Sequence, residues 1–483
     1  MVDSRFFRQE CFIAGKWISS HENAVVTVNN PATGKQLGTV PDLGRDEAKN
    51  AITAAHTVFP EWAAKTAAER GKFCSAIHDA LMDNQDALAE ILTLEMGKPL
   101  AEAKGEIAYG AAFFKWFAEE ASRVYGDVIP SPWADKRIVV IKEPVGVVTS
   151  ITPWNFPTAM IARKAAAALA AGCPIVCKPA SQTPFSALAY GVIAEDIGLP
   201  HGVLNVITGA PAPIADEFCE NPNVKKITFT GSTAIGKQLA ANAMKHMKRV
   251  SMELGGNAPL IIFDDADIDR AVEGAIACKF RNAGQTCVCA NRILVQSGIY
   301  DEFSQKFSAR INNMKVGNGL EDNVDQGPLI DQKAVKKVEE HIEDATSKGA
   351  KIVTGGKRHE LGGTYFEPTL LRDVTADMLI SDDETFGPVA PLFKFDTEEE
   401  AITMANDTEY GLASYFYTKD LGRAWRVMEA LEYGMVAINE GILSTPVAPF
   451  GGVKESGVGR EGSKYGLEDY LNIKYGLFGG LEN

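Results

Sequence analysis

The feature that most constrains the fold of this chain is a regular alternation of strand-like and helical segments that begins near residue 137. Short apolar, β-branched runs at residues 146–151, 174–178, 203–207 and 226–229 are separated by helical patterns. Strands that alternate with helices are connected by right-handed crossovers into a parallel sheet. The sequence therefore predicts an α/β fold with a doubly wound parallel sheet, which binds its ligands at the carboxyl ends of the strands.

Chemistry-bearing residues follow these strands. Asn155, Lys178 and Gly231 each come directly after one of them, as a cofactor site requires. A second α/β unit is expected from Ala258 onward, because strand-like and helical patterns continue to alternate there. Helical spacing dominates residues 43–125, before the first alternation, and short strands and loops are expected in the first 40 residues.

Composition narrows the class of partner. The 483 residues include 48 Lys and Arg against 63 Asp and Glu, a net charge of −15, which argues against nucleic acid or an anionic membrane as partner. No apolar run approaches the roughly 18 residues that span a bilayer, and no signal peptide is recognised. The eight cysteines lack disulfide spacing, and the seven histidines are isolated, so a cytoplasmic protein without a metal site is expected.

Residues 280–290, Phe-Arg-Asn-Ala-Gly-Gln-Thr-Cys-Val-Cys-Ala, contain the strongest candidate for a nucleophile. Gly284 lets the backbone approach a ligand, and Gln285 and Thr286 are poor core residues, so Cys287 is expected at the mouth of a cleft. The alternative for any such cysteine is a small buried apolar residue. A free thiol with a pKa near 8.5 is only a few per cent ionised at neutral pH. The site must therefore lower the pKa of Cys287 or supply a base.

Two other stretches supply the missing groups. Glu253 precedes a Gly-Gly turn, where burial would raise its pKa and suit it as a general base. Asn155 stands between two prolines and offers a side-chain amide to an oxyanion, together with the backbone N–H of Cys287. A nucleophile, a base and an oxyanion donor are the three parts that acyl-transfer chemistry needs.

Residues 231–238, Gly-Ser-Thr-Ala-Ile-Gly-Lys-Gln, differ at one position from a phosphate-binding P-loop. That motif ends in Ser or Thr to hold magnesium, whereas this stretch ends in Gln238. A nucleotide triphosphatase is therefore the remote alternative from another class. The favoured interpretation is a helix N-terminus, capped by Ser232, that offers backbone donors to a pyrophosphate.

Taken together, these stretches resemble the aldehyde dehydrogenase superfamily, with Cys287, Glu253 and Asn155 on its catalytic positions. The likeness covers almost the whole chain in the family's order. It includes residues 229–232 (Phe-Thr-Gly-Ser), 384–388 (Glu-Thr-Phe-Gly-Pro) and 449–452 (Pro-Phe-Gly-Gly).

The resemblance implies three domains. Residues 1–123 and 143–253 would form the dinucleotide-binding domain, and residues 254–450 the catalytic domain. Residues 124–142 and 465–483, which are strand-like, would form a small β arm that joins copies into a homodimer or homotetramer.

The resemblance also implies a nicotinamide dinucleotide cofactor. Lys178 would contact the adenosine ribose, and the small neutral Ser181 leaves room for a 2′-phosphate, so NADP is expected in preference to NAD. Glu384 would hold the nicotinamide ribose, with Phe386 against the ring. The remaining cofactor contacts are expected from Thr152, Pro153, Trp154, Gly231 and Ser232.

Within the superfamily, residues 160–164, 439–444 and 459–466 resemble the enzymes that oxidise succinate semialdehyde. Arg163, Arg281 and Ser444 match the positions that hold the far carboxylate there, and an arginine fork suits that task. Each arginine could instead serve a structural ion pair. Longer ω-oxo acids such as glutarate semialdehyde would satisfy the same residues, and they remain the alternative substrates.

Cys289 has no task in this mechanism. It is either a small wall residue or a resolving thiol that forms a disulfide with oxidised Cys287. The second role requires Cα atoms within about 7 Å, as a turn allows.

Overall fold

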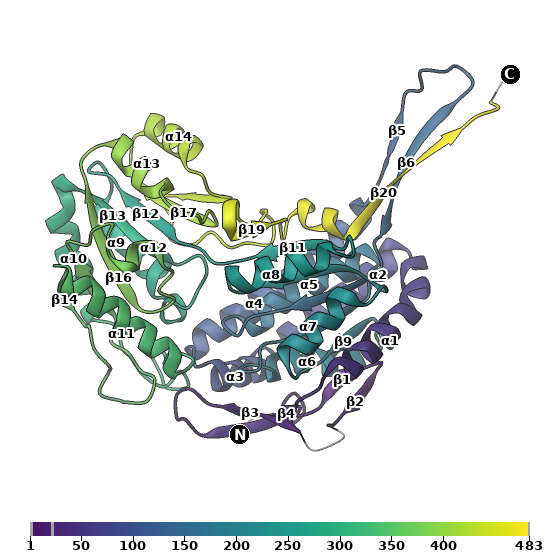
Figure 1. The fold of residues 1–483 in the computed structure, drawn as a ribbon, viewed down its shortest axis with the longest axis horizontal. Helices are drawn as coiled ribbons and strands as arrows, with labels where there is room; N and C mark the ends of the chain where they lie inside the picture. The colour runs from purple at the N-terminus through teal and green to yellow at the C-terminus, as the bar shows by residue number, and fades with distance from the viewer. Residues whose placement is uncertain (1–2, 21–23, 482–483) are drawn as a thin grey trace.

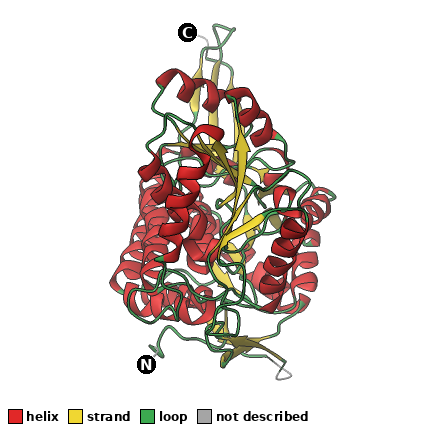
Figure 2. Cartoon of the chain, turned by 90° about the vertical axis from the view of Figure 1, so that its left-hand side faces the viewer, coloured by secondary structure: helices red, strands yellow, loops and turns green. Residues whose placement is uncertain are grey.

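Two sheets with helices on both faces and a projecting β arm make up the protein (Figures 1 and 2). The computed structural model describes residues 3–20 and 24–481. Within these ranges, no helix combines the length and apolar character needed to cross a membrane.

The first sheet has the doubly wound order that the alternation predicted. Its strands, in spatial order, are β19 (Gly457–Val458), β11 (Arg249–Glu253), β10 (Val224–Thr230), β7 (Val147–Ile151), β8 (Ile175–Lys178), β9 (Leu204–Val206), β1 (Cys11–Ile13) and β2 (Lys16–Ile18). The five from β11 to β9 are parallel. The chain runs outward from β7 to β9 and then returns to β10, so the strand order reverses between β7 and β10. Ligands bind at such a reversal, beyond the carboxyl ends of the strands.

Helices cover both faces of this sheet. One face packs on α1 (Arg45–Ala64), α7 (Pro211–Glu220) and α8 (Thr233–Met244). The other packs on α2 (Ala67–Asp83), α3 (Gln85–Met96), α4 (Leu100–Glu120), α5 (Pro157–Ala171) and α6 (Phe185–Asp196). All 15 residues of α5 are buried, and their many alanines let α4 approach closely.

The second sheet begins at Ala258, as expected. Its order is β14 (Lys351–Thr354), β15 (Thr369–Arg372), β16 (Val389–Phe395), β13 (Ala290–Gln296), β12 (Ala258–Ile262), β17 (Ala413–Tyr417) and β18 (Met435–Ile438). One face packs on α9 (Ile268–Phe280) and α10 (Tyr300–Asn312). The other packs on α11 (Gln332–Ser347), α13 (Glu398–Asn406) and α14 (Leu421–Ala430), and α12 (Leu379–Asp382) lies beside α11.

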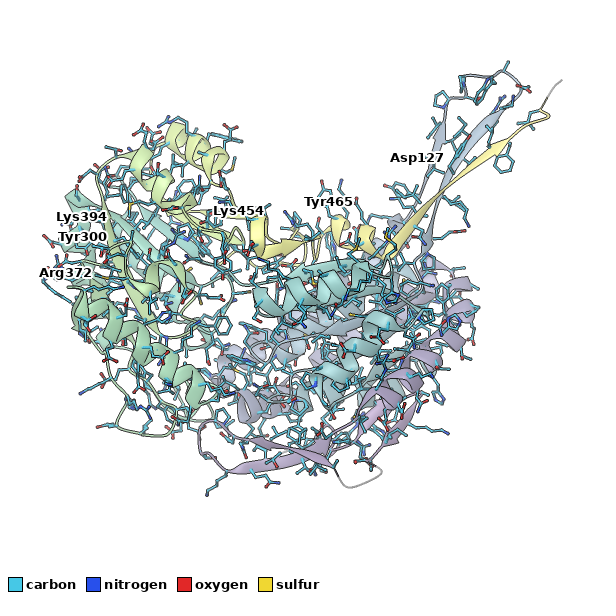
Figure 3. The ribbon with its side chains drawn as sticks, in the orientation of Figure 1. Asp127, Tyr300, Arg372, Lys394, Lys454 and Tyr465 are labelled. Atoms are coloured by element: carbon cyan, nitrogen blue, oxygen red, sulfur yellow. The ribbon has the colours of Figure 1, made fainter. Side chains whose placement is uncertain are left out.

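The arm consists of β5 (Asp127–Ile129), β6 (Arg137–Pro144) and β20 (Leu471–Phe478) in the order β20-β6-β5. Figure 3 shows side chains that stand clear of the rest of the protein around Asp127. The expectation of a strand from residue 465 is wrong at its start, because Lys464–Tyr470 is a 3-10 helix. Leu467 and Tyr470 are buried in the first core, and the strand begins only after this anchored segment, at Leu471. A separate hairpin near the N-terminus pairs β3 (Val25–Asn29) with β4 (Gln36–Pro41).

Candidate active site

The site lies where the carboxyl edge of the first sheet meets the loop that enters β13. Asn155 follows β7, Gly231 follows β10, and Glu253 is the last residue of β11. The turn after Glu253 passes close to the opposite loop, since a Cβ placed on Gly256 would lie 2.6 Å from the Cys287 carbonyl oxygen. Residues that are far apart in the sequence therefore converge here, as the strand order requires.

Cys287 lies in a turn between a short 3-10 segment (Arg281–Gly284) and β13, closed by a hydrogen bond from Cys289 N–H to the Thr286 carbonyl oxygen (3.0 Å). Its side chain is half-buried. It lines two cavities at once, one of about 280 Å³ and one of about 250 Å³. A thiol at the junction of two cavities can contact a substrate in one and a cofactor in the other.

The backbone before Cys287 is held in an uncommon conformation. Asn282 and Ala283 have φ values of 54° and 55°, in the left-handed region that non-glycine residues seldom adopt. The Asn282 side-chain amide donates to the carbonyl oxygens of Asn155 (3.1 Å) and Gln285 (3.2 Å). Gln285 in turn accepts from the N–H of Ile330 (2.9 Å). These bonds fix the strained loop, and with it the position of the thiol.

Asn155 is buried and oriented toward the same loop. Its side-chain Nδ2 donates to the Gln285 carbonyl oxygen (2.9 Å), which leaves the second N–H of that amide uncommitted. The Asn155 Oδ1 atom makes no hydrogen bond to a described residue. One donor thus remains for an oxyanion beside Cys287.

An ion pair that the sequence analysis missed anchors Asn155. Lys98 Nζ donates to the Asn155 carbonyl oxygen (2.8 Å) and to Glu106 Oε2 (2.7 Å), with both side chains fully buried. Glu106 Oε1 accepts from the N–H groups of Thr158 (2.9 Å) and Ala159 (3.1 Å) in the first turn of α5. Both charged residues belong to the helical segment before the first α/β alternation, where spacing alone did not distinguish them from surface charges.

Glu253 is buried, and neither of its carboxyl oxygens accepts a hydrogen bond from a described residue. Burial, and then the charge of Glu461, raises its pKa well above the ordinary value, against the opposing effect of Arg163 and Lys164. The carboxyl group does not line either cavity and lies toward Gly451. A raised pKa makes the Glu253 carboxylate a stronger base than an ordinary glutamate.

The thiol itself is not activated in this structure. Burial and the charge of Glu384 raise the pKa of Cys287 to about 12, and the opposing charge of Arg163 does not compensate. The raised pKa opposes a spontaneously ionised thiol, so of the two expectations proton removal by a base is the route that stays open.

The cavity of about 250 Å³ contains most of the expected contacts for a nicotinamide. Its lining includes Pro153, Trp154, Asn155, Gly231, Ser232, Glu384 and Phe386. Trp154 and Phe386 pack edge to face with ring centroids 5.5 Å apart. Lys337 of α11, which the sequence analysis missed, lines the same cavity and donates to the Glu384 carbonyl oxygen. Thr152 lies behind this lining and donates its N–H to the Lys178 carbonyl oxygen (3.1 Å).

A further cavity of about 190 Å³ lies across α8 and the end of β10. Its lining combines the apolar side chains of Phe229, Ile235 and Leu239 with Lys178, which suits an adenosine. Burial lowers the pKa of Lys178 to about 8. Ser181 is half-buried in the turn after Lys178 and outside this lining. The two cavities flank the strand ends that bind dinucleotides in such sheets, so a dinucleotide fits these residues.

The start of α8 differs from the expectation in one detail. Ser232 occupies the N-cap position of α8, but its side chain makes no capping hydrogen bond. It is exposed and instead lines the cavity of about 250 Å³, called the nicotinamide-sized cavity below. The lysine of the P-loop-like stretch, Lys237, pairs with Glu455 (2.6 Å) at the surface and does not turn back toward a phosphate.

The cavity of about 280 Å³ brings together the three residues that the sequence assigned to the substrate: Arg163, Arg281 and Ser444. Arg163 is buried and pairs with Glu461 (Nε to Oε2, 2.7 Å), while its guanidinium lies 3.8 Å from the Phe450 ring centroid. Arg281 forms no ion pair within the described residues and lies 5.2 Å from the Phe156 ring centroid. Glu102 lines the same cavity and also forms no ion pair within the described residues, and burial raises its pKa against the opposing charge of Arg281.

Cys289 is buried, lies outside the linings of both large cavities and directs its Sγ toward the Arg281 carbonyl oxygen (3.9 Å). Burial raises its pKa. The described cysteines are all free thiols, so the resolving role of Cys289 stays a prediction. The described ranges contain no group of three or more His, Cys, Asp or Glu side chains that could hold a metal ion.

Comparison with known proteins supports the same interpretation. The model of the aldehyde dehydrogenase family matches residues 17–475. A glutarate-semialdehyde dehydrogenase of Pseudomonas aeruginosa is 59% identical over 481 residues, covering 100% of each chain. An NADP(+) succinate-semialdehyde dehydrogenase of Escherichia coli strain K12 is 58% identical over 477 residues, covering 99% of each. The crystal structure of an E. coli NADP-dependent enzyme matches with a TM-score of 0.98 at 58% identity, covering 99% of both chains. The chain belongs to the aldehyde dehydrogenase family.

Proposed function

We propose that the protein oxidises succinate semialdehyde to succinate with NADP as the preferred cofactor. The observation that carries this proposal is the cavity that holds the Cys287 thiol together with the unpaired guanidinium of Arg281. An aldehyde at the thiol and a carboxylate at Arg281 describe an ω-oxo acid. The similarity to an NADP(+) succinate-semialdehyde dehydrogenase supports the four-carbon substrate and the cofactor.

Cys287 carries the covalent chemistry. Its sulfur attacks the aldehyde carbon as its proton leaves to a base, and the resulting oxyanion accepts hydrogen bonds from the free N–H of Asn155 and the backbone N–H of Cys287. A bound nicotinamide supplies the hydride acceptor, which leaves a thioester on Cys287. Trp154, Glu384 and Phe386 line the cavity that would hold that ring and its ribose.

Glu253 completes the cycle. A water molecule must lose a proton as it attacks the thioester, and the Glu253 carboxylate, whose basicity burial raises, accepts that proton. Because Glu253 lies outside both cavity linings, a change of its side-chain rotamer has to bring it to the thioester. Hydrolysis then releases the acid and restores the thiol.

A five-carbon substrate is the second candidate, and the similarity to a glutarate-semialdehyde dehydrogenase favours it. Steady-state kinetics with succinate semialdehyde, glutarate semialdehyde and butanal, each with NADP and NAD, tests both proposals. The highest kcat/KM is expected for succinate semialdehyde with NADP. A preference for the five-carbon acid would select the alternative, and equal rates for butanal would refute an ω-oxo-acid substrate.

The assembly is expected to be a homodimer or homotetramer. The arm exposes apolar side chains, including Val128 (79% exposed), Ile473 (73%) and Tyr475 (58%), which would be covered by another copy of the chain. The eight free thiols are consistent with a cytoplasmic location. Sedimentation of the purified protein would determine the number of copies.

A further inference from the structure

We propose that the hydroxyl of Tyr109 is a specificity-determining donor to the far carboxylate of the substrate. Tyr109 lies on α4 and lines the same cavity as Cys287, Arg163 and Arg281. No sequence motif pointed to it, because it occurs in a helical segment with an ordinary apolar spacing. The proposal rests on the proposed function, since it assumes a substrate with a carboxylate remote from the aldehyde.

The hydroxyl is buried without a hydrogen bond. The Tyr109 Oη atom is inaccessible to solvent and meets the geometry of a hydrogen bond with no described residue, while the nearby Ser444 side chain is polar and close enough to act on the hydroxyl, lowering a pKa that burial raises. Leaving a buried hydroxyl without a partner is unfavourable. A ligand or an ordered water molecule that accepts from it would remove that cost.

The ring of Tyr109 is held in place. It packs edge to face on Phe113, one turn further along α4, with ring centroids 5.0 Å apart. The hydroxyl is thus presented by a rigid helix and a rigid neighbour. A donor that is already oriented loses little entropy when a ligand binds to it.

The other donors of the cavity complement this hydroxyl. Arg163 Nε is in ion-pair contact with Glu461 (2.7 Å), and neither Nε nor Nη2 makes a hydrogen bond to a described residue. Arg281 has no ion pair, and the charges of both arginines act on Tyr109. A carboxylate offers about four acceptor sites. It can therefore accept from Tyr109 and from the free N–H groups of both arginines, whereas an uncharged aldehyde uses none of them.

The test is Tyr109→Phe, which removes only the hydroxyl and keeps the ring on Phe113. The kcat/KM for succinate semialdehyde is expected to fall roughly 10- to 100-fold, as for the loss of a hydrogen bond to a charged group. The kcat/KM for butanal is expected to stay within twofold of the wild type. Equal losses for the two aldehydes, or no loss for either, would overturn the proposal.

Tyr190→Phe is the matched control, because Tyr190 is a buried tyrosine outside the cavity whose hydroxyl donates to the Thr158 carbonyl oxygen (3.0 Å). Its loss should lower the melting temperature without changing the preference for a carboxylate. Tyr109→Phe should leave the melting temperature unchanged or raise it, since its hydroxyl has no partner in the free protein. Two failures can be told apart. A wild type that does not prefer succinate semialdehyde to butanal would refute the proposed function. A wild type with that preference, and a Tyr109→Phe variant that keeps it unaltered, would refute only the role of Tyr109.

Discussion

Gly284 packs directly against Gly387, so that a Cβ atom on Gly284 would lie 2.1 Å from the Gly387 carbonyl oxygen. Gly284 belongs to the loop that carries Cys287, and Gly387 follows Phe386 in the loop that lines the nicotinamide-sized cavity. The two loops therefore meet backbone to backbone at this point. The left-handed φ of Phe386 (53°) shows that the second loop is also held in an unfavourable conformation. The loop of Cys287 and the loop of Phe386 are therefore held together at this contact.

Gly284→Ala should separate these loops. The added methyl group meets the Gly387 carbonyl, and the residue is in the left-handed region (φ 74°), so we expect kcat/KM to fall at least about 100-fold. Alkylation of Cys287 by iodoacetamide, followed by mass spectrometry, should change in rate as the thiol moves. Gly198→Ala is the control, because it has a similar φ (64°) with no atom within 4 Å of the added Cβ. Activity in Gly284→Ala equal to that of Gly198→Ala would show that the contact has no role.

Cys287 and Glu253 should have separable effects on the time course. Cys287→Ala removes the nucleophile and should abolish the formation of reduced cofactor. Glu253→Gln keeps the nucleophile but cannot accept a proton from water, so one equivalent of reduced cofactor per active site should form and turnover then stop at the thioester. Stopped-flow absorbance at the reduced-nicotinamide band measures both. Steady turnover by Cys287→Ala would disprove the mechanism.

The preference for NADP should weaken as the pH rises. Burial lowers the pKa of Lys178 to about 8, so the cationic form that attracts a 2′-phosphate is present below that pH and is lost above it. The dissociation constant of NADP should then increase by up to about tenfold per pH unit between pH 8 and 9.5, while that of NAD stays nearly constant. Titration by fluorescence quenching measures both constants. Lys178→Met should remove the difference, and an unchanged pH dependence in that variant would assign the effect to another group.

The two arginines of the substrate cavity should behave differently. Arg281 has no ion pair, so Arg281→Met should reduce kcat/KM for succinate semialdehyde roughly 30-fold or more and spare butanal. Arg163 pairs with Glu461, and its removal leaves that buried carboxylate with Lys164 as its remaining ion-pair partner. Arg163→Met should therefore also lower the melting temperature and impair both aldehydes. If Arg163→Met instead kept the wild-type melting temperature and lost activity only toward succinate semialdehyde, the role of Arg163 would be confined to the substrate.

The sequence predicted what depends on local order and left out what depends on contacts across the fold. The alternation of strands and helices placed Asn155, Lys178 and Gly231 at strand ends, and the single glycine and small polar residues before Cys287 identified its loop. Lys98 and Tyr109 escaped detection because both belong to the helical segment before the alternation, where the apolar spacing is the same whether or not a residue faces a site. Lys164 of α5 pairs with Glu461, which lies 297 residues further along the chain. No local sequence pattern could therefore reveal that the cations of α5 already have a carboxylate partner within the protein.

The complete burial of α5 has a consequence for how the substrate range of this scaffold can change. Arg163 belongs to a helix in which all 15 residues are enclosed, so its replacement by a side chain of another size forces neighbouring helices to repack. Ser444, by contrast, lines the cavity from a loop and is only half-buried. Directed evolution toward aldehydes without a carboxylate should therefore accumulate its first tolerated substitutions around Ser444 and reach α5 only after compensating changes in α4.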